Sequence, residues 1–151
     1  MFSDTHCHLY HKQFDGDREA MLQRALEAGV TRFYLPNVDH ESIAGMHALA
    51  EAHPDRCFPM MGLHPCSVGE DNVAAMAEVE GLLSNGRYCA VGEIGIDLYW
   101  DKTYLKQQQR QLQHIAHYDA LTGIPNRVLL ADRMHQALAQ ALRAPFGTAL
   151  L

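Results

Sequence analysis

Hydrophobic residues recur along residues 1–93 in two alternating patterns, short apolar runs and longer stretches with helical spacing. The short runs predict four β-strands, over residues 1–9, 31–35, 57–62 and 88–93. Three stretches between them predict helices: one that begins after Asp15 or Asp17 and ends at Gly29, then residues 42–53 and 71–84. Strands that alternate with helices are typical of a parallel sheet with right-handed crossovers. The pattern therefore predicts an α/β fold.

Polar side chains follow each predicted strand at the point where it ends. They are His6 and His8 for the first strand, Asn37 for the second, His64 for the third, and Glu93 with Asp97 for the fourth. In parallel sheets, functional groups collect at the carboxyl ends of the strands. Each residue alone has a structural alternative, as a loop cap or a solvated side chain. Because polar residues follow all four predicted strands, we expect them to form one functional site at the carboxyl-terminal edge of the sheet, called the rim below.

The first strand carries the pattern His-x-His. In an extended strand, side chains alternate between faces, so His6 and His8 share one face while Cys7 points away. Two imidazoles on one face can reach the same metal ion, and histidine is a common ligand of zinc-like ions. A single His-x-His also occurs by chance, so this pair predicts a metal site only together with further ligands.

Glu93 supplies such a ligand, because the run AVGEIG places its carboxylate directly after an apolar strand. Burial there is costly unless a cation or hydrogen bonds compensate. A carboxylate can bridge two metal ions, as two-metal phosphodiester chemistry requires. The alternative is a structural ion pair between Glu93 and an Arg or Lys.

Composition limits the classes of function. The chain has 151 residues, 48% of them hydrophobic, which fits one domain with a real core. A net charge of −6 and a pI near 5.9 argue against a surface that coats nucleic acid. They do not exclude a nuclease, because a bound metal supplies local positive charge.

The four cysteines, Cys7, Cys57, Cys66 and Cys89, form no C-x-x-C pair, and the sequence shows no charged and then apolar leader at its start. Free thiols indicate a cytoplasmic protein. No run approaches the roughly 18 apolar residues that span a membrane. We expect no membrane partner.

The motifs DTHCHL, GLHP and VGEIGID, the last followed by LYW, resemble in their order and spacing the TatD family of metal-dependent hydrolases. The resemblance covers residues 1 to about 113. It implies a (β/α)₈ barrel that cleaves DNA or another phosphodiester with one or two divalent ions, Mg, Mn or Zn. It also implies that His6 and His8 bind the first metal and that Glu93 is a ligand shared by both metals. Glu93 is then also a catalytic residue, as is His64, which lies near the substrate phosphate.

The sequence departs from that family after the fourth predicted strand. A (β/α)₈ barrel needs about 250 residues. The later strands of the family, which carry two more His and an Asp that activates water, find no match here. We therefore expect a truncated TIM-barrel-like parallel sheet of about four strands, followed by C-terminal α-helices, and impaired activity.

Residues 114–143, which include DALTGIPNR, resemble the opening of a GGDEF (diguanylate cyclase) domain. From the residues alone, Gly123 and Pro125 break the chain and Asn126 can cap a helix. The apolar face of that helix consists of Leu130, Met134, Leu138 and Leu142. We expect no cyclase activity, because neither the metal-binding Asp nor the hairpin of that family is found. The predicted domains are residues 1–113, TatD-like, and 114–151, GGDEF-like, with one helix over 103–118 across the junction.

Three functions are compatible with these observations. The first is a TatD-type hydrolase, and the second is a catalytically inert chimeric or truncated fragment. The third is a signalling module, which requires Leu130, Met134 and Leu138 to be exposed, whereas we expect them to be buried. A half barrel has exposed sheet edges, so we expect either a homodimer or coverage by the helix over 127–142.

Overall fold

The computed structural model describes residues 1–70, 72–84, 88–118, 126, 130–131 and 134–136. Its strands are β1 (Phe2–Asp4), β2 (Val30–Pro36), β3 (Cys57–Met61) and β4 (Ala90–Val91). Its α-helices are α1 (Arg18–Glu27), α2 (Ile43–Ala52), α3 (Val73–Leu83) and α4 (Leu105–His117). Two 3₁₀ turns, η1 (Lys12–Phe14) and η2 (Pro65–Ser67), lie in the connections after β1 and β3.

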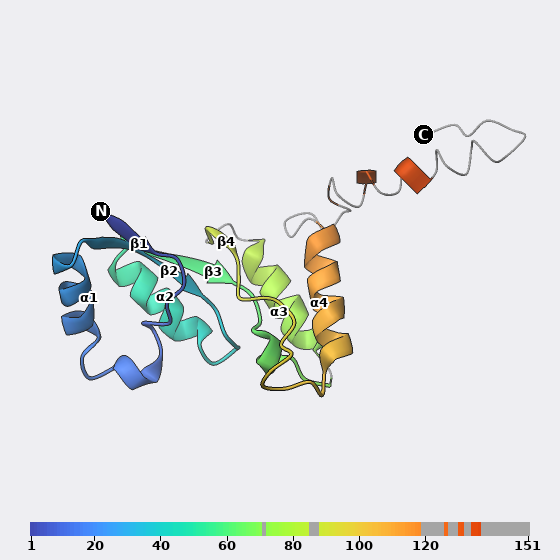
Figure 1. Ribbon diagram of the computed structural model, residues 1–151, viewed down its shortest axis with the longest axis horizontal. Coiled ribbons are helices and arrows are strands. Elements are labelled where there is room, and N and C mark those ends of the chain that lie inside the picture. Colours follow the sequence, from blue (N-terminus) through green and yellow to red (C-terminus); the bar gives the residue numbers. More distant parts are fainter. Residues whose placement is uncertain (71, 85–87, 119–125, 127–129, 132–133, 137–151) are drawn as a thin grey trace, which may run out of the picture.

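The strands form one parallel sheet in the order β1-β2-β3-β4, and a helix lies in each connection between neighbouring strands (Figure 1). This confirms the predicted α/β fold, a curled half barrel with four strands. Parallel neighbours require such crossovers, because a tight turn cannot return the chain to the same end of the sheet.

The core lies between the sheet and its helices. Phe33 and Leu35 of β2 and Met61 of β3 are almost fully buried, together with Leu22 of α1 and Met46 of α2. These strand residues are two apart within β2, as expected when alternate side chains face the helices. The rings of Tyr34 and Phe58 pack together at 5.3 Å on the other face, where both are half-buried. The helix layer therefore covers one face of the sheet.

Two predicted strands are wrong in extent. The first ends at Asp4 and does not extend to His8 as predicted, although the Cys7 N–H still donates to the Tyr34 carbonyl at 3.1 Å. The fourth is only Ala90–Val91, extended on either side by single hydrogen bonds from Cys89 and Gly92 to β3. The hydrophobic pattern predicts which segments pack against the sheet. The bounds of a strand depend on backbone hydrogen bonds, which the pattern does not specify.

The first helix begins after Asp17, the N-cap residue, but that side chain makes no capping hydrogen bond and pairs with Arg24 at 3.5 Å instead. Gly29 follows the helix end with φ of 87°, a conformation that favours glycine, as expected at this position. The helices predicted over residues 42–53 and 71–84 are confirmed as α2 and α3.

The helix predicted over 103–118 is confirmed as α4. The DALTGIPNR segment and the helix predicted over 127–142 fall mostly outside the described residues, as does Leu138. Leu130 and Met134 are 54% and 40% exposed, so the expectation that they are buried is wrong. Within the described part of the chain, no helix has the length and apolar character needed to cross a membrane.

Candidate metal centre

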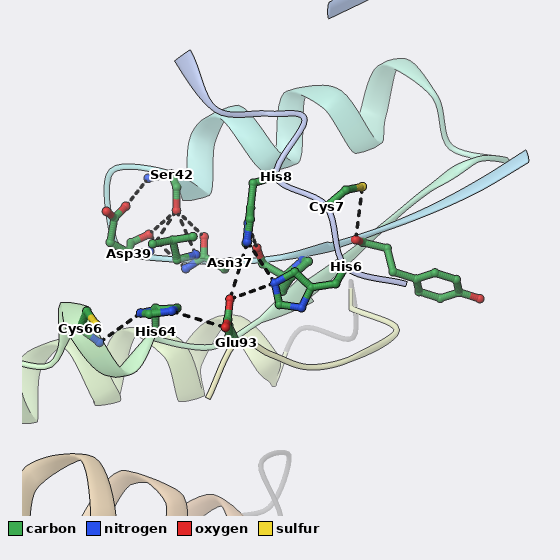
Figure 2. A network of polar contacts seen from close by, with 12 residues as sticks. His6, Cys7, His8, Asn37, Asp39, Ser42, His64, Cys66 and Glu93 are labelled. Carbon is green, nitrogen blue, oxygen red and sulfur yellow. Dashed lines mark hydrogen bonds and ion pairs between the residues drawn. The ribbon is translucent and has the colours of Figure 1, made fainter. Parts of the chain in front are cut away.

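Three of the predicted site residues meet at one point. His6 Nε2 lies 3.2 Å from Glu93 Oε2, His8 Nε2 lies 3.7 Å from the same oxygen, and the two Nε2 atoms are 3.1 Å apart (Figure 2). One ligand atom from each residue lies within 4.8 Å of the others. The predicted ligand set, drawn from the start of the chain and from the end of β4, is therefore brought together in space.

The curl of the sheet makes this meeting possible. β1 and β4 are the two edges of the sheet, and in a flat four-stranded sheet such edges lie about 14 Å apart. The side chains that follow the two strands nevertheless touch, because the strand ends bend toward a common centre. The same geometry closes barrels, in which the carboxyl ends of the strands form the rim of the site.

His8 is oriented by groups behind its ring. Its Nδ1 lies 3.1 Å from the carbonyl oxygen of Pro36 and 2.8 Å from the hydroxyl of Tyr10, which itself donates to Pro36 O. A carbonyl only accepts, so Nδ1 of His8 carries a proton, and in the neutral ring the lone pair is then on Nε2, the nitrogen on the side of Glu93. A ring nitrogen hydrogen-bonded to a backbone carbonyl in this way is typical of metal-binding histidines.

His64 has the opposite tautomer. The backbone N–H of Cys66 donates to His64 Nδ1 at 3.1 Å, so the neutral ring carries its proton on Nε2. That Nε2 lies 3.4 Å from Glu93 Oε1 and can donate to it. His64 therefore holds one oxygen of Glu93, while the other oxygen faces His6 and His8 (Figure 2).

The alternative explanation for Glu93, an ion pair with Arg or Lys, finds no support in the part of the chain that the structure describes. Its ion-pair partners among the described residues are His6, His8 and His64. The Glu93 backbone is also fixed, because its N–H donates to the Asn37 carbonyl at 3.0 Å. The carboxylate is about a quarter exposed and surrounded by imidazoles, an environment that a cation would complete.

Asn37 lies under the rim as a support, buried to 1% exposure. Its side-chain amide donates to the carbonyls of Asp39 and Gly62, and its oxygen accepts from Ser42. Its backbone N–H contacts the carbonyls of Met60 and Gly92. Its polar groups are thus used in joining the ends of β2, β3 and β4.

Gly62 is a site residue that sequence reasoning missed. A Cβ built there would lie 2.6 Å from the Glu93 carbonyl oxygen and 2.7 Å from the Gly92 carbonyl carbon. Only glycine allows this close approach between the end of β3 and the segment after β4. The signal in the sequence was the glycine in GLHP, directly after an apolar strand.

Two further predicted residues lie outside the cluster. Asp97 forms a turn, in which its Oδ1 accepts from the N–H groups of Tyr99 and Trp100 at 2.8 and 2.6 Å. Cys7 points away from His6 and His8, as predicted, and its thiol contacts the Tyr34 carbonyl. Burial raises the pKa of Cys7 to about 12, so this thiol stays protonated.

The donor set fits a divalent cation. Burial of the ring and then the neighbouring His6 lower the pKa of His8, which favours the neutral imidazole that binds metals. Two imidazole nitrogens and one carboxylate are ligands that zinc accepts, and the carboxylate also suits magnesium and manganese. His6 is about half exposed, which gives the site an open side.

The chain is similar to known proteins over most of its length. The sequence model "TatD related DNase" matches residues 3–118. The "Uncharacterized metal-dependent hydrolase YjjV" of Escherichia coli (strain K12) is 34% identical over an alignment of 148 residues, which covers 94% of this chain and 55% of that protein. The "3'-5' ssDNA/RNA exonuclease TatD" of Edwardsiella piscicida is 31% identical over 144 residues, 95% of this chain and 54% of that protein.

A crystal structure of the YjjV protein superposes with a TM-score of 0.66 and 37% identity, over 74% of this chain and 44% of that one. This chain thus spans about half the length of the relatives it matches. A match over 94% of the chain also extends past residue 118, into the segment that resembles a GGDEF opening. That second resemblance and the boundary at 113 stay predictions, whereas the match over residues 3–118 shows that the chain belongs to the TatD related DNase family.

Proposed function

We propose that this chain carries the metal-binding half of a TatD-type hydrolase that cleaves phosphodiester bonds in single-stranded nucleic acid. One observation supports this most strongly. The Nε2 atoms of His6 and His8 and the carboxylate of Glu93 converge, and His8 is held in the tautomer that a metal ligand needs. The family match and the names of the relatives give the reaction class.

In this proposal His6, His8 and Glu93 hold a divalent ion, which is Mg, Mn or Zn. The bound ion would polarise a phosphodiester and lower the pKa of a water molecule. The chain's own residues supply position and orientation. Pro36 and Tyr10 fix the ring of His8, and His64 fixes one oxygen of Glu93, so that the other oxygen remains directed at the ion.

His64 has a second part in the proposal. Its ring lies at the rim beside Glu93 and is about a quarter exposed, so a substrate that reaches Glu93 also reaches His64. Its Nε2–H can donate to a phosphate oxygen as well as to Glu93 Oε1. We therefore assign it to the substrate phosphate rather than to the metal.

We further propose that residues 3–118 by themselves, with three ligands from one part of the rim, turn over substrate more slowly than the longer relatives. Pairing of two chains through the edge strands β1 and β4 would enlarge the rim and cover the edges. We place the protein in the cytoplasm, on the grounds of its free cysteines.

The test is hydrolysis of a labelled single-stranded DNA oligonucleotide by the purified chain, with Mg²⁺, Mn²⁺ or Zn²⁺ added in turn. Glu93→Ala and His6→Ala are expected to abolish cleavage and metal binding. His40→Ala and Glu78→Ala are matched controls, because this exposed pair, 2.8 Å apart, is also a His–Glu contact but lies outside the cluster.

Two results would contradict the proposal in different ways. Cleavage that survives in Glu93→Ala would come from a contaminant or another site. Metal binding that both variants abolish, without cleavage of any single-stranded DNA or RNA by the wild type, would favour the inert fragment instead. The oligomeric state, measured by light scattering at several concentrations, tests the pairing of edges.

A further inference from the structure

A pair of aromatic rings stands exposed in the loop that follows Glu93. Tyr99 and Trp100 are 80% and 79% exposed, although they are among the largest apolar side chains of the chain. Their rings contact each other edge to face, with centroids 4.8 Å apart and planes at 88°. An exposed patch of large apolar side chains is typical of a surface that binds a ligand or a partner.

The loop that carries the rings is fixed rather than loosely attached. Asp97 Oδ1 accepts from both the Tyr99 and the Trp100 backbone N–H, and Asp101 Oδ1 accepts from Thr103 N–H at 2.8 Å. The hydrogen bond from Trp100 N–H lowers the pKa of Asp97, so the turn keeps its charged acceptor in mildly acidic solution. The two rings are thus presented on an ordered backbone.

The loop is also connected by hydrogen bonds to the segment that carries His64 of the candidate metal centre. The Asp97 N–H donates to Gln108 Oε1 at 2.9 Å, and Gln108 Nε2 donates to the Pro65 carbonyl at 3.0 Å. Gln108 is 1% exposed, and its hydrogen bond to Pro65 is buried while that from Asp97 is part-buried. Pro65 directly follows His64, which touches Glu93. Trp100 itself lies seven residues after Glu93, which places it within about 25 Å of the carboxylate.

The chemistry of this surface fits nucleobases. Every base has a flat face that stacks on an aromatic ring, so an aromatic platform binds a single strand without reading its sequence. Bases paired inside a duplex do not offer those faces. The next exposed side chain, Lys102, adds a positive charge that suits a phosphate, although Asp97 and Asp101 keep their negative charges in the same loop.

We propose that Tyr99 and Trp100, in the loop that follows Glu93, form a stacking platform for unpaired bases of single-stranded nucleic acid. This inference rests on the proposed function for the class of substrate. It adds a binding surface that needs no metal, since base stacking involves the rings alone.

Trp100 is the only tryptophan of the chain, so its fluorescence reports on the platform directly. The experiment titrates the full chain, in the presence of a chelator, with a short single-stranded DNA oligonucleotide. A strand of the same length in which abasic sites replace the bases serves as the ligand control. We expect the intact strand to quench Trp100 and the abasic strand to leave it unchanged.

Variants give a second measurement, by anisotropy of a labelled strand. Trp100→Ala is expected to weaken binding about 5- to 150-fold, the loss of one stacked base, and Trp100→Phe to keep most of it. Leu98→Ala is the matched control, because Leu98 is 65% exposed in the same loop but has no ring. Melting temperatures establish that each variant is folded.

Equal quenching by the abasic strand, or equal affinity of Trp100→Ala and the wild type, would overturn the platform. The outcome is separable from that of the proposed function. Quenching of Trp100 by the intact strand, together with no cleavage by the wild type under any metal, would contradict hydrolysis while supporting the platform. Cleavage by the wild type, together with unchanged binding by Trp100→Ala, would support hydrolysis and contradict the platform.

Discussion

Replacing Gly62 by alanine tests whether the end of β3 sets the position of Glu93. The added Cβ would lie 2.6 Å from the Glu93 carbonyl oxygen, whereas ordinary contact begins at 3.4 Å. The Glu93 backbone must therefore move by about 0.8 Å, since the obstructing atoms are backbone and cannot rotate away. Overpacking of this kind costs about 1–3 kcal/mol, which lowers the melting temperature of a chain this long by about 2–12 °C.

The same shift carries the carboxylate away from His6 and His8, so we expect metal affinity to fall about 10- to 100-fold, as when the support of a metal ligand is removed. Isothermal titration with Mn²⁺ or Zn²⁺ measures this. Gly95→Ala is the matched control, because its added Cβ would meet no atom within 4 Å in the same motif. Wild-type affinity and melting temperature in Gly62→Ala would refute the reasoning.

Three further predictions follow from contacts described above. Tyr10→Phe removes the hydroxyl that contacts both His8 and Pro36, so titration calorimetry should show metal affinity reduced about tenfold with the fold retained. Leu35→Ala truncates a fully buried side chain of β2 and should cost about 2–5 kcal/mol in urea unfolding, whereas a loss below 1 kcal/mol would contradict the packing. The hydrogen bond to Glu78 raises the pKa of His40, so this pair stabilises the folded state fully below about pH 6.5 and loses that effect as the pH rises through the raised pKa. The difference in melting temperature between the wild type and His40→Gln should therefore shrink as the pH rises.

The fold could be predicted well where the pattern of the sequence reflects burial. β2 and α2 carry apolar residues with clear periods of two and of three to four, and both lie within two residues of their predicted bounds. β4 was predicted too long, because the residues after Val91 follow the sheet through isolated hydrogen bonds rather than a ladder. The pattern of side chains is the same whether the backbone forms a ladder or isolated hydrogen bonds.

The residues that converge at the candidate site could be predicted, but not the residues that support them. His6, His8 and Glu93 were identified because charged or metal-binding groups beside apolar strands are chemically conspicuous. Asn37 was assigned to the rim, yet its buried amide binds neighbouring backbone, which no local pattern reveals. Gly62 was missed because its role depends on a backbone far along the chain.

The distance along the chain between the ligands has a consequence for folding kinetics. His6 and His8 follow one edge strand and Glu93 follows the other, so the cluster forms only after all four strands have paired. A metal held there would bind the native state and not its early intermediates. A bound metal would therefore slow unfolding and leave the folding rate unchanged.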